Sequence, residues 1–349
     1  MPILLCTFSS SCIGTHDLKL ECNLSPFFYF QPFAPIDEWV YTADMKTEEF
    51  SLISDDGKSI HVYHWAPQTV TKACIIVAHG LGEHAARYGR FATALTSAGY
   101  EVWAPDHRGH GKTASEGEIG WLADRDGFRR VVDDLKCLAD RVQAEHTDKK
   151  LFLFGHSWGS FLAQGFIAVY GKMLAGCILS GTAGDGGPLI SAGRAIAGIG
   201  CSFKGQKTRS KLLSDMTFGA YNKAFKPART PFDWLSRDPA EVDKYIADPL
   251  CGFMGSFGLY RDLLAGLQWI HSPSTMASVP HALPLLMFAG AKDPVGAASG
   301  TFDWLYDKYK AQGVTDLTRK LYPDGRHEAL NDICRDEVTS DVVSWLNAH

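Results

Sequence analysis

The sequence lacks three features that mark large classes of protein. It has no apolar run near the roughly 18 residues that indicate a membrane-spanning helix. It has no basic run longer than a pair and a net charge of −5, whereas a nucleic-acid-binding protein should present a basic face. Its nine cysteines are odd in number and contain no Cys-x-x-Cys pair. We therefore expect no spanning segment, no nucleic-acid partner and no disulfide scaffold.

The cysteines and the N-terminus together indicate a reducing compartment. Cys74 and Cys177 lie inside apolar runs, where a free thiol behaves as a small hydrophobic side chain. The first eight residues, MPILLCTF, are apolar, but the first lysine or arginine is Lys19, so the basic start of a secretory signal is missing. We expect a cytoplasmic location, and a peripheral, transient contact with a membrane surface stays open.

Residues 1–45 are predicted to form an N-terminal extension without clear periodicity. They contain an aromatic cluster, PFFYFQPF, that begins at Pro26. This cluster could pack onto the domain that follows, which is the commoner role of aromatic side chains, or it could contact a membrane or a partner. We favour the first interpretation.

Residues 46–349 are predicted to form one α/β domain. Apolar and polar residues alternate on both sides of an Asp-Gly turn at Gly57, which indicates a β-hairpin. Continuous apolar strands then alternate with helical patterns, and this predicts a mostly parallel central sheet with helices on both faces. The alternation stops between about 182 and 272 and resumes in the strand at 283–295. The middle segment is therefore predicted to be an insertion.

Gly155-x-Ser157-x-Gly159 lies between an apolar strand and a helical pattern. In that context the spacing matches a nucleophile elbow, in which a sharp turn exposes the serine hydroxyl. A glycine on each side of the turn leaves room for neighbouring strands. The alternative is a tight structural turn whose serine has no chemical role.

A serine nucleophile needs a base and an acid, which follow it in this fold in the chain order acid, then histidine. Asp293 follows an apolar strand directly, and His327 lies in the loop YPDGRHEAL. Donors for an oxyanion are expected from the backbone N–H groups of Trp158 and of Leu81 in the loop HGLGEH.

Five longer motifs resemble the monoacylglycerol lipase and lysophospholipase branch of the α/β-hydrolases, and the resemblance covers about residues 48–349. The motifs are HGLGEHAARYGRFATAL, PDHRGHGKT, GHSWGS, AGAKDPV and YPDGRHEALND. The resemblance implies an α/β-hydrolase fold with an inserted helical cap, Ser157 as nucleophile, Asp293 as acid and His327 as base. It also implies the oxyanion amides of Leu81 and Trp158. Trp158 stands where relatives often carry Met and could reshape the acyl entrance.

The resemblance also implies the activity. We expect a serine hydrolase that cleaves carboxylic esters with an apolar acyl chain, such as a monoacylglycerol or lysophospholipid, through an acyl-enzyme. A small lipid ester is the expected partner, and no cofactor is required. A thioesterase, acyltransferase or peptidase with the same triad stays open, as does a small-molecule receptor without hydrolytic activity.

Other residue groups point to no further chemistry. His61 and His64 are three apart on a predicted strand and should face opposite sides, and the loop with His107 and His110 is structural by resemblance. We therefore expect no metal site. Several cap phenylalanines could line an acyl channel or form the core of the cap, so none is assigned to binding: Phe203, Phe218, Phe225, Phe253 and Phe257.

Overall fold

A β-hairpin begins the described part of the chain. The structure is a computed structural model that describes residues 46–349, so the predicted extension 1–45 and its aromatic cluster lie outside the described residues. Strands β1 (Lys46–Ile53) and β2 (Ser59–Ala66) pair antiparallel, as the alternating pattern predicts. The turn contains Gly57 with φ of +84°, a conformation that favours glycine.

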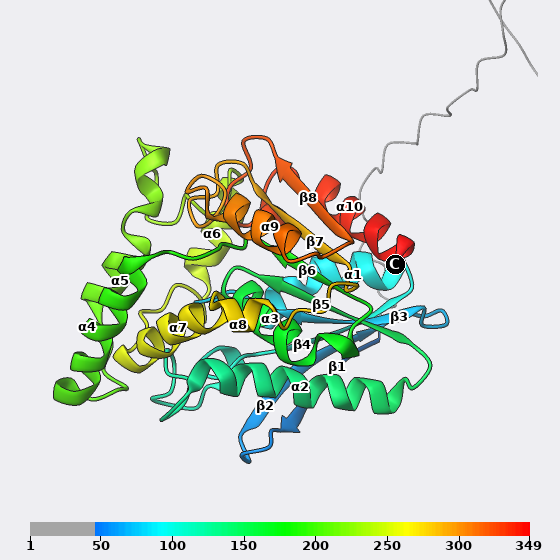
Figure 1. The fold of residues 1–349 in the computed structure, drawn as a ribbon, viewed down its shortest axis with the longest axis horizontal. Helices are drawn as coiled ribbons and strands as arrows, with labels where there is room; N and C mark the ends of the chain where they lie inside the picture. The colour runs from blue at the N-terminus through cyan, green and yellow to red at the C-terminus, as the bar shows by residue number, and fades with distance from the viewer. Residues whose placement is uncertain (1–45) are drawn as a thin grey trace, which may run out of the picture. The chain divides into compact units, whose positions relative to one another are not determined.

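The eight strands form one sheet in the order β1-β2-β4-β3-β5-β6-β7-β8 (Figure 1). The strands from β4 to β8 in this order run parallel, whereas β2 is antiparallel to both β1 and β4. The remaining strands are β3 (Ala73–Ala78), β4 (Tyr100–Pro105), β5 (Lys150–His156), β6 (Gly176–Ser180), β7 (Leu285–Gly290) and β8 (Leu317–Tyr322). The predicted mostly parallel central sheet is confirmed.

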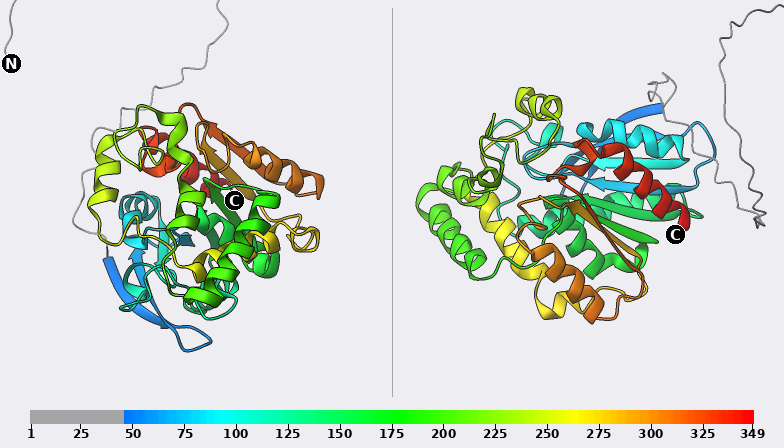
Figure 2. Two further views of the ribbon diagram at one scale, coloured as in Figure 1. Left: turned by 90° about the vertical axis from the view of Figure 1, so that its left-hand side faces the viewer. Right: turned by 90° about the horizontal axis from the view of Figure 1, so that it is seen from above.

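Helices cover both faces of this sheet, and Figure 2 shows the two layers in its right-hand view. One face packs against α1 (Gly89–Ser97) and α10 (Arg335–Ala348). The other packs against α2 (Gly127–Glu145), α3 (Trp158–Tyr170) and α9 (Thr301–Ala311). The predicted apolar stripe of α2 is buried, namely Phe128, Val131, Val132, Leu135, Leu138 and Val142.

Helix α9 was not expected from the sequence pattern. It connects β7 to β8, which are parallel and therefore need a crossover connection. Its buried side chains are only Phe302, Leu305 and Tyr309, and charged residues lie between them. The apolar stripe is therefore too sparse to stand out as a helical pattern.

Five α-helices and one short 3-10 helix, Tyr221–Phe225, occupy the chain between β6 and β7. The α-helices are α4 (Pro188–Lys204), α5 (Lys211–Phe218), α6 (Pro239–Ala247), α7 (Phe257–Ile270) and α8 (Pro273–Met276). Helix α4 packs along α7, and α7 in turn packs on α2 and α3. Figure 1 shows α4, α5 and α6 beyond one end of the strands, where the site described next is found. No helix within residues 46–349 is both long and apolar enough to cross a bilayer.

Candidate active site

Ser157 occupies a strained turn between β5 and α3. Its φ of +53° and ψ of −120° are unusual for a residue with a side chain. A Cβ atom on Gly155 would lie 2.4 Å from the carbonyl oxygen of Gly159, and one on Gly159 would lie 2.1 Å from that of Ala78. The close approach of strand and helix therefore requires both glycines and holds the serine at the start of α3.

Asp293 and His327 meet beside the same end of the sheet. Asp293 lies three residues beyond β7, and His327 lies five residues beyond β8. The Nδ1 of His327 donates a hydrogen bond to Oδ1 of Asp293 at 2.9 Å, and both side chains are buried. Burial alone would lower the pKa of His327, but the charge of Asp293 and this hydrogen bond outweigh burial and raise the pKa above the usual 6.5.

Ser157 and His327 line one cavity of about 240 Å³. The His327 ring binds Asp293, and no direct hydrogen bond joins it to the Ser157 hydroxyl. The ring of His156 lies 4.9 Å from that of His327. Burial, together with the charge of His327, lowers the pKa of His156 to about 4, so His156 is neutral near neutral pH.

Leu81 lines the same cavity, in the loop that follows β3. Glu83 fixes this loop: its Oε1 accepts a hydrogen bond from the Gly80 amide at 2.5 Å and another from the Tyr88 hydroxyl at 2.8 Å. The other predicted oxyanion donor belongs to Trp158, the first residue of α3. Helix starts leave backbone N–H groups without intrahelical partners.

A buried ion-pair network connects the Leu81 loop to the His327 loop. Arg87 pairs with Glu83, and its guanidinium also binds both carboxylate oxygens of Glu328 at 2.9 and 2.7 Å. Burial would lower the pKa of Arg87, but the charges of Glu328 and Glu83 outweigh it and raise the pKa. This network was not predicted from the sequence, where the four-residue spacing of Glu83 and Arg87 is the one pattern that indicates part of it.

The segment between β6 and β7 supplies most of the apolar wall of the cavity. Its lining residues include Phe218, Phe232, Trp234, Leu235, Tyr245, Phe253 and Tyr260. Tyr245 also donates a hydrogen bond to the carbonyl oxygen of Gly82 at 2.8 Å, which attaches this segment to the Leu81 loop.

The five phenylalanines that were not assigned from the sequence lie in different environments. Phe218 and Phe253 line the cavity, whereas Phe257 is buried in the core. Phe225 packs in a small apolar cluster around Trp234, and Phe203 is 85% exposed.

Trp158 is not among the residues that line the cavity. Its ring is buried, stacks on His110 at 5.0 Å and lies outside the cavity lining. Burial lowers the pKa of His110 to about 3, so this histidine is a neutral packing partner of the tryptophan.

The side chains of His61 and His64 lie on opposite faces of β2. His61 binds Glu49, whereas His64 stacks on Trp103.

Comparisons with known proteins identify the family. The sequence model described as "Serine aminopeptidase, S33" matches residues 69–333. The chain belongs to this S33 family of α/β-hydrolases. Human monoglyceride lipase is 30% identical over 85% of this chain and 88% of its own length. Monoacylglycerol lipase from Mycolicibacterium smegmatis is 29% identical over 86% of this chain and 97% of its own.

Solved structures of other hydrolases share the fold. A carboxyl esterase from Bacillus coagulans superposes with a TM-score of 0.81 at 31% identity, over 87% of this chain and 99% of that chain. A soluble variant of monoglyceride lipase from Saccharomyces cerevisiae gives a TM-score of 0.70 at 20% identity, over 90% and 99% of the two chains, which shows the fold alone. The α/β-hydrolase fold, the monoacylglycerol lipase-like branch and the class of carboxylic ester hydrolase are confirmed.

Proposed function

We propose that this S33 hydrolase cleaves carboxylic esters that carry one apolar acyl chain, such as monoacylglycerols or lysophospholipids. The observation that supports this most is the composition of one cavity. Ser157, His327 and the Leu81 loop line it together with aromatic side chains from the segment 182–272. We assign that segment as a cap over the acyl chain of the substrate, inserted into the domain 46–349. The names of the relatives agree with a lipid ester.

The proposed reaction forms an acyl-enzyme on Ser157. The serine Oγ attacks the ester carbonyl carbon while Nε2 of His327 accepts the hydroxyl proton. The oxyanion accepts hydrogen bonds from the amides of Leu81 and Trp158. The bond to the alcohol oxygen then breaks, and His327 returns the proton to the departing alcohol. Water next attacks the acyl carbonyl with His327 again as base, which releases the fatty acid and restores the serine.

Asp293 has two roles in this scheme. Its hydrogen bond with Nδ1 holds the imidazole of His327 in the tautomer whose Nε2 is free to accept a proton. Its negative charge also stabilises the imidazolium that forms during acylation and deacylation. The raised pKa of His327 reflects this second effect.

The charges around the cavity favour an ester over an N-terminal peptide. An aminopeptidase would need a carboxylate that is free to bind the substrate ammonium group. The carboxylates that line the cavity are Glu83, Asp215 and Glu328, and each already pairs with a cation. Arg87 holds both glutamates, and Lys211 binds Asp215 at 2.6 Å.

We also propose a transient contact between the cap and a membrane or lipid aggregate. Leu189 and Phe203 of α4 are 77% and 85% exposed, and α5 adds the exposed Leu212 and Met216. Ser214 of α5 lines the cavity, so this helix has one face toward the substrate and apolar side chains in solvent. The exposed apolar side chains of α5 therefore lie on a helix that lines the cavity, which suits a substrate that is drawn from lipid.

A substrate panel on the purified full-length chain tests the activity. It compares p-nitrophenyl esters of increasing chain length, a monoacylglycerol, a lysophospholipid, a palmitoyl thioester and proline amides. We expect the highest kcat/KM on long-chain carboxylic esters and none above background with Ser157→Ala. Preference for the thioester or the amides would replace the proposed substrate class, and turnover of none would favour a receptor.

A further inference from the structure

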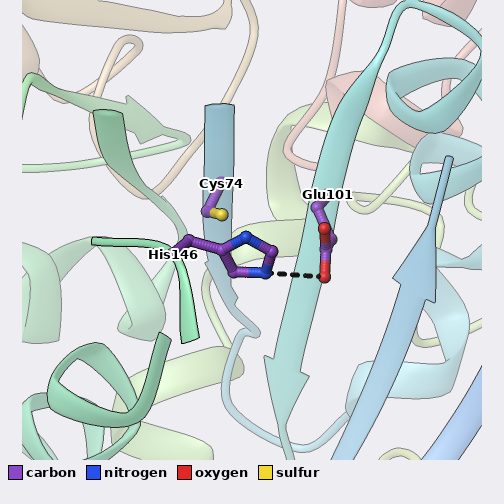
Figure 3. Close-up of side chains that lie close together, drawn as sticks. All are labelled: Cys74, Glu101 and His146. Carbon is purple, nitrogen blue, oxygen red and sulfur yellow. Dashed lines mark hydrogen bonds and ion pairs between the residues drawn. The ribbon is translucent and has the colours of Figure 1, made fainter. Parts of the chain in front are cut away.

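A second cluster of reactive side chains lies at the opposite end of the central strands. Cys74 is the second residue of β3, Glu101 is the second residue of β4, and His146 directly follows α2. Cys74 and Glu101 are register partners, so their side chains share one face of the sheet. Figure 3 shows the three side chains converging, and their ligand atoms lie within 4.8 Å of one another.

Glu101 is a buried carboxylate without a permanent cation beside it. Its Oε1 accepts hydrogen bonds from Nε2 of His64 at 2.7 Å and of His146 at 3.1 Å, and its Oε2 accepts one from the Thr71 hydroxyl at 2.7 Å. No lysine or arginine of the described chain forms an ion pair with it. Carboxylates are seldom buried without a charged partner.

Two other buried carboxylates of this protein have such a cation, whereas the buried Asp106 is held by the backbone amides of Ala85 and Lys112. Glu83 is paired with Arg87, and Asp134 is paired with Arg108 at 2.7 Å. Around Glu101 the corresponding positions hold two imidazoles and a thiol instead. Thiolate, imidazole and carboxylate are the three side-chain types that bind Zn²⁺ in proteins.

We propose that Cys74, Glu101 and His146 bind one zinc ion, with His64, which already donates a hydrogen bond to Glu101, in the fourth position. Binding releases the Cys74 thiol proton to solvent, and the proton on Nε2 of His146 is exchanged through solvent for one on Nδ1. Bonds from His146 and Glu101 to the metal then replace the hydrogen bond between them. Thr71 keeps its hydrogen bond to the second carboxylate oxygen and orients Glu101. His146, the most exposed of the three ligands, gives the ion access from solvent.

The location assigns this ion a structural role. The site lies at the N-terminal ends of β3 and β4, whereas Ser157, Asp293 and His327 lie beyond the C-terminal ends of their strands. Zinc here would tie two neighbouring strands to the end of α2. The expected effect is therefore on thermal stability and not on the chemistry of ester cleavage.

The test measures zinc binding by the full-length chain after removal of metal with a chelator. Isothermal titration with ZnCl₂ should show one ion per chain, and zinc at about 100 times the Kd should raise the Tm by about 5 °C. Cys74→Ser and His146→Gln should each weaken binding at least about tenfold. Cys137→Ser, on α2 and outside the cluster, is the matched control and should bind as the wild type does.

Cobalt(II) gives a second readout that does not depend on stability. A thiolate–cobalt charge-transfer absorption should appear in the wild type and in Cys137→Ser, and it should be absent from Cys74→Ser. Near-ultraviolet circular dichroism of each variant verifies that it is folded.

The chain contains a competing cluster, His84, Asp248 and Cys251, which also places its ligand atoms within 4.8 Å. Zinc binding that persists in Cys74→Ser but is lost in Cys251→Ser would overturn the proposal and move the ion to that cluster. Absence of zinc binding by the wild type would overturn it as well, and would make Glu101 the centre of a hydrogen-bond network only.

Discussion

His327 donates a hydrogen bond from Nδ1 to Oδ1 of Asp293 at 2.9 Å, with both side chains buried at the end of the parallel sheet. The two residues are 34 positions apart and come from loops after neighbouring strands, β7 and β8. This pair controls the protonation of the proposed general base, and two of the predictions depend on it.

The pH dependence of kcat/KM should report the raised pKa of His327. A general base must be neutral, so activity should be lost as the pH falls through that pKa and should reach a plateau above it. The half-maximal rate is expected above pH 6.5 because the charge of Asp293 raises the pKa of the imidazole. A rate profile with a soluble short-chain ester measures this, and a midpoint well below 6.5 would contradict the electrostatic argument.

Replacing Asp293 with asparagine should reverse this shift. Without the negative charge, burial dominates and the pKa of His327 falls below 6.5, so the acid limb of the profile moves to lower pH. The rate on the plateau should fall by roughly 10⁴, because the imidazole loses both its orientation and its counter-charge. If Asp293→Asn kept a near-normal rate, another carboxylate would be the acid.

Arg87→Ala should destabilise the fold and impair the active site together. It leaves Glu83 and Glu328 as buried charges without a cation, and breaking such a pair costs about 3–5 kcal/mol. Urea unfolding measures the loss. The Leu81 loop depends on Glu83, so kcat should fall as well.

Arg87→Lys is the matched variant for this network. It keeps the charge but cannot bind both oxygens of Glu328, so it should recover only part of the stability. Full recovery by lysine would show that charge alone, without the two-bond geometry, is sufficient.

Phe203→Ser tests the proposed contact of the cap with lipid. The side chain is 85% exposed and lies outside the cavity lining, so folding and soluble substrates should be little affected. Binding to phosphatidylcholine vesicles should weaken by about tenfold, the loss expected when one large apolar side chain no longer enters the lipid. Flotation with vesicles measures binding, and Lys204→Ser beside it is the control.

Equal flotation of the wild type and Phe203→Ser would contradict a contact through α4. If neither protein floated, the lipid contact as a whole would be wrong. Hydrolysis of a soluble ester in the same samples shows that the proteins are intact.

Most of the fold could be predicted from local patterns, for a physical reason. Strands buried on both faces, such as β3 and β5, are continuous apolar runs, and the stripe of α2 follows the helical period. Helix α9 was not predicted because its apolar positions are few. The parallel β7–β8 pair nevertheless requires a crossover connection. At that position, the need for a crossover between parallel strands would have predicted a helix, whereas hydrophobic periodicity did not.

The candidate site was only partly predictable. Ser157 lies in a local motif, and the chain order of the fold selected Asp293 and His327. By contrast, Arg87 and Glu328 are 241 positions apart, and Cys74 and His146 come from different elements. No spacing rule links such residues, because the three-dimensional fold alone brings them together.

The proposed ester cleavage depends most on Ser157 as the nucleophile, and a fluorophosphonate probe tests this directly. The purified protein is treated with the probe, digested, and the modified peptide is located by mass spectrometry. We predict a single adduct on Ser157, formed faster above the pKa of His327, and no adduct in Ser157→Ala. An adduct on another serine, or ester hydrolysis that survives in Ser157→Ala, would contradict the account.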